Sequence, residues 1–266
     1  MQMKIEPTLI GIAAAALLVA LVVALVSTPV VKSLAAKVGA VDVPRDGRRM
    51  HDHPIPRMGG LAIFLGFLLS TLLFAELTPQ LRGMLLGAAV IVVLGIFDDI
   101  YALSALPKLF VQIAAALIAV FSGNVIETLS NPNIFSADPY WNLGVLSIPV
   151  TVLWIVAITN AVNLIDGLDG LACGVSTISS MTLLVISLVV SDGPAAILMA
   201  ALAGGCIGFL PYNLNPAKIF MGDTGATFLG YVLAVVSIQG LFKFYTIISF
   251  AVPFLMLGLP IFDTCF

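Results

Sequence analysis

Long apolar runs alternate with short polar connections along almost the whole chain. Because each run is continuous, and does not alternate residue by residue, it predicts a helix and not a strand of a barrel. A membrane-spanning helix needs about 20 apolar residues. The pattern therefore predicts a polytopic transmembrane bundle of about nine helices, near 8–31, 59–75, 83–97, 108–122, 145–159, 171–190, 194–211, 226–242 and 244–262.

Composition supports a membrane location. Apolar residues make up 61% of the 266 residues and charged residues 9%, whereas soluble domains carry roughly 25% charged residues. No long polar segment separates the spans, so residues 1–266 are predicted to form a single all-α integral membrane domain. The net charge of −3 leaves no basic surface for nucleic acid.

The connection after the first span is the most basic one. By the positive-inside rule it is cytoplasmic. Alternation then places the connections near 98–107, 160–170 and 212–225 on the cytoplasmic side of the cell membrane, and those near 76–82, 123–144 and 191–193 outside. The basic residues of the first connection are Lys32, Lys37, Arg45, Arg48, Arg49 and Arg57.

Acidic side chains gather on the side that charge assigns to the cytoplasm. Asp98 and Asp99 end one apolar helix, and solvation at the interface is the alternative reading of this pair. A second series recurs every third residue, so neighbouring members project to similar sides of a helix. A simple turn needs only one such side chain, whereas the series contains Asn160, Asn163, Asp166 and Asp169.

A third acidic motif is Gly222-Asp-Thr-Gly225, in which Asp223 or Thr224 could also serve as a helix N-cap. Crowded carboxylates repel one another unless a cation lies among them. No nearby His or Cys pair suggests zinc, and oxygen ligands suit Mg²⁺, with Mn²⁺ as the alternative. The acidic motifs therefore predict phosphoryl chemistry at a membrane surface, with Asp223 among the metal ligands.

The basic connection faces the same compartment. It could fix topology and contact lipid headgroups, or it could clamp a phosphate with Arg57 and His53. Lys108, at the start of another span on this face, is a further candidate for substrate binding.

Four strings in this order resemble the bacterial polyprenyl-phosphate N-acetylhexosamine-1-phosphate transferases of glycosyltransferase family 4, to which the phospho-MurNAc-pentapeptide translocases are related. The strings are His53-Pro-Ile-Pro-Arg57-Met-Gly-Gly60, Phe97-Asp-Asp99, Asn160-Ala-Val-Asn163-Leu-Ile-Asp166-Gly-Leu-Asp169-Gly-Leu-Ala172 and Phe220-Met-Gly-Asp223-Thr-Gly225. The resemblance implies that Asp98 and Asp99 are catalytic and that Asp223 binds magnesium. It also implies that Asn163, Asp166 and Asp169 line the nucleotide and metal site.

The reaction implied by the resemblance joins UDP-GlcNAc and undecaprenyl phosphate to give undecaprenyl-diphospho-GlcNAc and UMP, which starts teichoic acid or O-antigen type glycans. UDP-MurNAc-pentapeptide is the alternative donor. Family members have ten or eleven spans and are expected to be homodimers. This chain is expected to lack a C-terminal cytoplasmic loop and the last helices. Rival readings are a secondary transporter, which would hold its charges near the bilayer midplane, and an inactive membrane scaffold.

Overall fold

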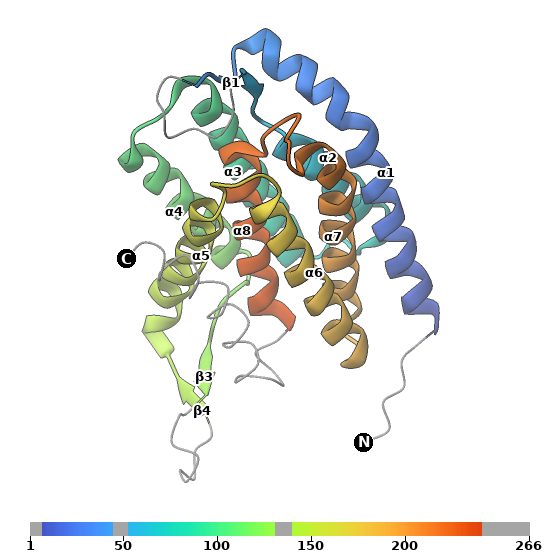
Figure 1. Ribbon diagram of the computed structural model, residues 1–266. Coiled ribbons are helices and arrows are strands. Elements are labelled where there is room, and N and C mark those ends of the chain that lie inside the picture. The colour runs from blue at the N-terminus through green and yellow to red at the C-terminus, as the bar shows by residue number, and fades with distance from the viewer. Residues whose placement is uncertain (1–6, 45–52, 131–139, 241–266) are drawn as a thin grey trace.

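A computed structural model describes residues 7–44, 53–130 and 140–240 (Figure 1). These residues form eight α-helices, one short 3₁₀ helix and two small antiparallel hairpins, in which β1 pairs with β2 and β3 with β4. The elements are α1 (Pro7–Val38), β1 (Val41–Asp42), β2 (Ile55–Pro56), α2 (Gly60–Phe74), α3 (Pro79–Tyr101), α4 (Ala105–Phe121), β3 (Thr128–Ser130), β4 (Tyr140–Asn142), η1 (Gly144–Leu146), α5 (Ser147–Leu164), α6 (Leu171–Val189), α7 (Gly193–Asn213) and α8 (Gly222–Gly240).

The structure confirms the predicted polytopic helical membrane fold. Eight of the nine predicted segments correspond to α1–α8, and the ninth, 244–262, lies outside the described residues. Among the described residues, five helical segments are long and apolar enough to cross a membrane. They are α1, α3, α6, α7 and the segment in which η1 continues into α5. The apolar helices α2, α4 and α8 are shorter.

Several helices extend beyond the apolar runs that predict them, and the extensions of α3 and α8 carry acids. α3 continues to Tyr101, so Asp98 and Asp99 lie within its last turn, and α8 starts at Gly222, so Asp223 lies in its first turn. Hydropathy falls at a charged residue, but the backbone stays helical when the carboxylate finds partners. Asp98 and Asp99 are both buried, so they do need partners inside the protein.

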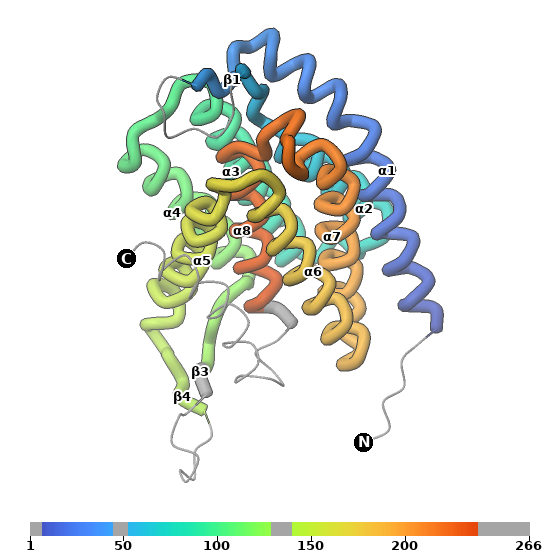
Figure 2. Tube along the Cα trace, viewed as in Figure 1, coloured from blue at the N-terminus to red at the C-terminus, as the bar shows by residue number. Residues whose placement is uncertain are grey.

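α8 is the central helix of the bundle (Figures 1 and 2). It contacts α3, α5 and α2 along its length. All its residues from Thr224 to Ile238 are buried, on every side of the helix. A helix that is apolar on all sides needs protein neighbours all round, and this is the position that the fold gives it.

Small residues let α1 lie close against α2 and α7. α1 carries a row of buried alanines, and a Cβ added at Gly204 or Gly208 of α7 would collide with a backbone carbonyl of α1, that of Leu17 or Leu21. Membrane helices associate by close van der Waals packing, because lipid is as apolar as their own side chains. The large side chains of α1, such as Leu18 and Val26, instead point outward.

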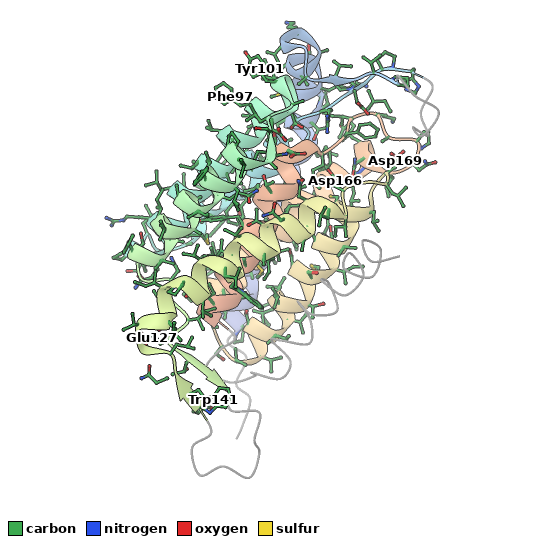
Figure 3. All side chains as sticks on the ribbon, turned by 90° about the vertical axis from the view of Figure 1, so that its left-hand side faces the viewer. Phe97, Tyr101, Glu127, Trp141, Asp166 and Asp169 are labelled. Carbon is green, nitrogen blue, oxygen red and sulfur yellow. The ribbon has the colours of Figure 1, made fainter. Side chains whose placement is uncertain are left out.

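The connections between helices gather at two opposite ends. Contacts join the α1–α2, α3–α4, α5–α6 and α7–α8 connections to one another, which confirms the grouping that alternation predicted, and we call this the site end. Figure 3 shows Phe97, Tyr101, Asp166 and Asp169 at the site end. Glu127 and Trp141 lie at the opposite, far end, with the β3–β4 hairpin (Figure 3).

We expect Gly204→Ala to lower the free energy of unfolding by about 1–3 kcal/mol, because the added methyl meets the Leu17 carbonyl in a packed interface. The matched control is Gly174→Ala on α6, where an added Cβ meets nothing within 4 Å. Without a collision the change should be neutral or stabilising, since Gly is a poorer helix former than Ala. Thermal unfolding midpoints of the two purified variants in detergent test this, and equal midpoints would contradict the packing account.

Candidate active site

The N-terminus of α8 is capped from another helix. The Asp99 carboxylate of α3 accepts hydrogen bonds from the backbone N–H of Asp223 (3.0 Å) and Thr224 (3.1 Å) and from the Thr224 hydroxyl (2.6 Å). The first N–H groups of a helix have no partner within it, and a carboxylate there also favours the positive end of the helix dipole. Asp99 therefore fixes where α8 begins relative to the end of α3.

This junction requires residues without side chains. Gly222 has a φ of +71°, and a Cβ there would lie 2.5 Å from Oδ2 of Asp99. A Cβ at Gly60 would overlap the backbone of Gly225, where the starts of α2 and α8 meet. Glycine permits both the left-handed backbone at Gly222 and the contact of the two helix starts.

The segment that leads into α2 is hydrogen-bonded to the segment that leads into α8. The N–H of Phe220 donates to the Pro56 carbonyl (2.8 Å), and the N–H of Gly59 donates to the Phe220 carbonyl (2.9 Å). Between these bonds lies Arg57, whose Nε is 3.7 Å from Oδ1 of Asp99. The pairing brings one of the predicted phosphate-binding residues to the acidic cluster.

Lys108, in the first turn of α4, lies between two carboxylates. Its Nζ is 2.8 Å from Oδ2 of Asp98 and 3.1 Å from Oδ2 of Asp223. The other oxygen of Asp98 accepts from the N–H of Leu103 (2.7 Å), and the Asn163 amide nitrogen is 3.4 Å from Oδ2 of Asp223. α3, α4, α5 and α8 thus each supply one polar side chain to a common centre.

Asp166 lies beside this centre, in the connection between α5 and α6. Its burial, and then the negative charges of Asp223 and Asp99, raise the pKa of Asp166 to about 7, while the Arg57 guanidinium opposes the rise. A raised pKa favours the protonated acid, so Asp166 carries less negative charge near neutral pH than a solvated aspartate does. The neighbouring carboxylates contribute to this rise, as the predicted crowding of acids implies, but burial contributes more.

Two other predicted residues hold connections and helices together. Oδ2 of Asp169 accepts from the Ala217 N–H (2.9 Å) and the Asn215 amide (3.2 Å), which ties the α5–α6 connection to the α7–α8 connection. The Asn160 amide nitrogen donates to Oε1 of Gln112 (2.6 Å), which links α5 to α4. His53 lies on the exposed stretch that leads into β2.

The structure thus brings seven of the ten predicted residues together and places the other three around them. The seven are Arg57, Asp98, Asp99, Lys108, Asn163, Asp166 and Asp223, and the others are His53, Asn160 and Asp169. Sequence reasoning missed Gln112, which is buried and pairs with Asn160. Its one signal was an amide within the otherwise apolar run 108–122.

The two carboxylates at this centre, Asp98 and Asp223, are oxygen ligands of the kind that Mg²⁺ prefers. Within the described residues no group of three or more His, Cys, Asp or Glu side chains is arranged to hold a metal ion. Mg²⁺ usually binds through one or two carboxylates together with substrate phosphates, so Asp98 and Asp223 suffice for that mode. The residues present fit the ion as part of a phosphate complex, and its binding stays a prediction.

The fold and site define a polytopic membrane protein with acids and cations interleaved at one end of the bundle. The chain belongs to glycosyl transferase family 4, whose model matches residues 81–241. The probable undecaprenyl-phosphate N-acetylglucosaminyl 1-phosphate transferase of Bacillus subtilis is 47% identical over 94% of this chain and 69% of its own length. These matches confirm the resemblance that the motifs carry.

Two more distant groups of relatives also match. The decaprenyl-phosphate N-acetylglucosaminephosphotransferase of Mycobacterium tuberculosis is 37% identical over 87% of this chain and 60% of its own length. The phospho-N-acetylmuramoyl-pentapeptide-transferase of Moorella thermoacetica is 34% identical over 84% of this chain and 73% of its own length. The chain therefore spans roughly two thirds of the length of these relatives, all of which are named as sugar-phosphate transferases.

Replacing Lys108 by Met should lower the free energy of unfolding by about 1–2 kcal/mol, because Asp98 and Asp223 then face each other without a cation. Adding Asp98→Asn should recover most of the loss, since it removes the repulsion. Thermal unfolding of the two single variants and the double variant forms the double-mutant cycle that measures this coupling. Strictly additive effects would show that Lys108 does not act between the two carboxylates.

Proposed function

We propose that this protein transfers N-acetylglucosamine-1-phosphate from UDP-GlcNAc to undecaprenyl phosphate and so initiates a cell-envelope glycan. A phosphate oxygen of the lipid forms a bond to the sugar-linked phosphorus of UDP-GlcNAc. The bond from that phosphorus to the oxygen shared with the uridine-linked phosphate breaks. The products are undecaprenyl-diphospho-GlcNAc and UMP.

The observation that carries the proposal is the position of Lys108 between Asp98 and Asp223 at the end of a membrane bundle. Phosphoryl transfer needs mainly positioning and neutralisation of negative charge. A lysine and two carboxylates at the end of the spans supply this where a lipid phosphate meets a water-soluble nucleotide. The names of the relatives agree, and the higher identity to the GlcNAc enzyme, 47% against 34%, favours UDP-GlcNAc over UDP-MurNAc-pentapeptide.

Each central residue has a role in this proposal. Lys108 and Arg57 bind phosphate oxygens, and Asn163 orients the Asp223 carboxylate. Asp223, with Asp98, would hold Mg²⁺ together with the substrate phosphates, and the ion would supply neutralisation of negative charge there. Direct attack by the lipid phosphate and a route through a phospho-aspartate give the same products, and they differ in whether the configuration at phosphorus inverts or is retained.

We further propose that the site end faces the cytoplasm. Among the described residues, five of the six Lys and Arg lie at or near the site end, namely Lys32, Lys37, Arg57, Lys108 and Lys218, whereas Arg82 lies at the far end. The positive-inside rule assigns the basic end to the cytoplasm. The resemblance also leads us to propose a homodimer, which a mass determination of the detergent-solubilised protein would test.

We expect Asp223→Asn to reduce lipid-dependent release of UMP from UDP-GlcNAc by at least about 100-fold, because the variant loses a charged ligand for the phosphate complex. The measurement uses full-length protein in membranes, with undecaprenyl phosphate and Mg²⁺ each added or omitted. Wild-type release should need both.

The matched control is Asp192→Asn at the far end. Asp192 caps α7 through a bond from the Ala195 N–H, and asparagine caps a helix about as well as aspartate does. This variant should keep wild-type activity. If folded wild-type protein released no UMP from UDP-GlcNAc, the GlcNAc assignment would fall, and release from UDP-MurNAc-pentapeptide instead would identify the alternative donor.

Orientation has its own test, which needs no activity. Lys218 at the site end and Glu127 at the far end are both charged and exposed, so cysteines there should react with a thiol reagent from water. In intact cells a membrane-impermeant maleimide should label Glu127→Cys, and it should label Lys218→Cys only after permeabilisation. The reverse pattern would place the site outside the cell. Cys173 and Cys206 are buried, and Cys265→Ser removes the third cysteine of this sequence.

A further inference from the structure

Two neighbouring aspartates, Asp98 and Asp99, face different surroundings. We propose that Asp99 is a positioning residue, which holds the first turn of α8 and thereby the Asp223 carboxylate, and that Asp98 alone of the pair takes part in the chemistry. This inference rests on the proposed function, because it assigns roles within the same site. It departs from the sequence-based prediction that both residues are catalytic.

The two oxygens of Asp99 are already fully engaged. Oδ1 accepts from the N–H of Asp223, and Oδ2 accepts from both the N–H and the hydroxyl of Thr224. The side chain has 0% of its surface exposed, whereas Asn163 and Asp223, at the centre of the site, are partly exposed. To reach a phosphate, Asp99 would have to give up these three bonds and leave the start of a buried helix uncapped.

Asp98 is also buried, but its partners differ from those of Asp99. One turn of helix is about 3.6 residues, so adjacent side chains point about 100° apart. The Asp98 side chain therefore points toward α4, whereas that of Asp99 points toward α8. Its Oδ2 is bound by Lys108, the same amine that is bound to Asp223. Asp98 is therefore on the side of the cluster where phosphates would be neutralised.

The bonds to Asp99 can control the position of Asp223 because one of them is made by Asp223 itself. The backbone N–H of Asp223 donates to Asp99, while its side chain reaches Lys108 and Asn163. Gly222, just before it, leaves room for the Asp99 carboxylate, since a Cβ added there would collide with both carboxylate oxygens. A shift of this turn would move the Asp223 carboxylate away from Lys108.

A second carboxylate restrains the same segment further upstream. Asp169 accepts from the Ala217 N–H and the Asn215 amide, in the connection that leads to α8. Arg57 lies 3.7 Å from Asp99 and balances part of its buried charge. These five acidic residues therefore divide into two groups, with Asp98, Asp166 and Asp223 around the centre, and Asp99 and Asp169 holding the backbone that carries Asp223.

Hydrogen–deuterium exchange of residues 218–230 in full-length protein, in lipid nanodiscs, tests the positioning role without any reaction. Asp99→Ala removes all three acceptors and should speed exchange at the start of α8 by about 10-fold or more. Thr224→Val removes only the hydroxyl donor and keeps the side-chain shape, so it should give a smaller increase and remains informative if Asp99→Ala does not fold. Asp98→Asn is the comparator and should leave exchange in this segment unchanged.

The turnover of the same variants separates positioning from chemistry. Asparagine keeps one acceptor oxygen at position 99. The kcat of Asp99→Asn should therefore be at least about 10-fold higher than that of Asp99→Ala, with little change in KM for UDP-GlcNAc. Thr224→Val should lower kcat as well. Asp98→Asn should show no comparable recovery over Asp98→Ala, because a charged group in the reaction is lost in both.

Two results would overturn the proposal. One is wild-type exchange in Asp99→Ala, which would show that the carboxylate does not hold the turn. The other is an Asp99→Asn variant as inactive as Asp99→Ala beside a fully active Thr224→Val variant, which would show that Asp99 reacts directly. If wild-type protein released no UMP, the proposed function would fail, while the exchange measurement would still decide the role of Asp99.

Discussion

The start of α8 has to be capped inside the protein, and most of the site follows from that constraint. From Thr224 onward α8 is buried on all sides, and an unpaired N–H away from water is costly. Asp99 meets this need from the last turn of α3, and its carboxylate fits only because Gly222 has no side chain. The cap joins two helices and leaves Asp223 turned toward Lys108.

The cluster is stable because its charges of opposite sign are interleaved. Lys108 separates Asp98 from Asp223, and Arg57 lies beside Asp99. Each cation is close enough to its carboxylates to lower their mutual repulsion, and each remains partly exposed. The same cations can bind phosphate oxygens, so the groups that allow the acids to cluster also suit the chemistry we propose.

The bundle behind the site provides the rigid frame. Gly204 and Gly208 let α7 lie against α1, while the reciprocal amides of Asn160 and Gln112 join α5 to α4. Gln112 is buried, and the amide of Asn160 satisfies it there. Two of the helices that carry central residues, α4 and α5, are therefore held together by a hydrogen-bonded pair beside the site.

The sequence by itself determined the membrane spans, the shared end of the acidic motifs and the family, because apolar length, charge bias and motif order are properties of the chain alone. Only the tertiary structure decided which partner each polar side chain has. Asp98 and Asp99 are indistinguishable neighbours in the sequence, yet one meets Lys108 and the other caps α8, since adjacent helical residues face different helices. Asp169 likewise matched a substrate-binding motif, but in the folded protein its carboxylate accepts a hydrogen bond from the backbone N–H of Ala217. Spacing fixes the side of a helix on which a residue lies, and packing determines what lies opposite.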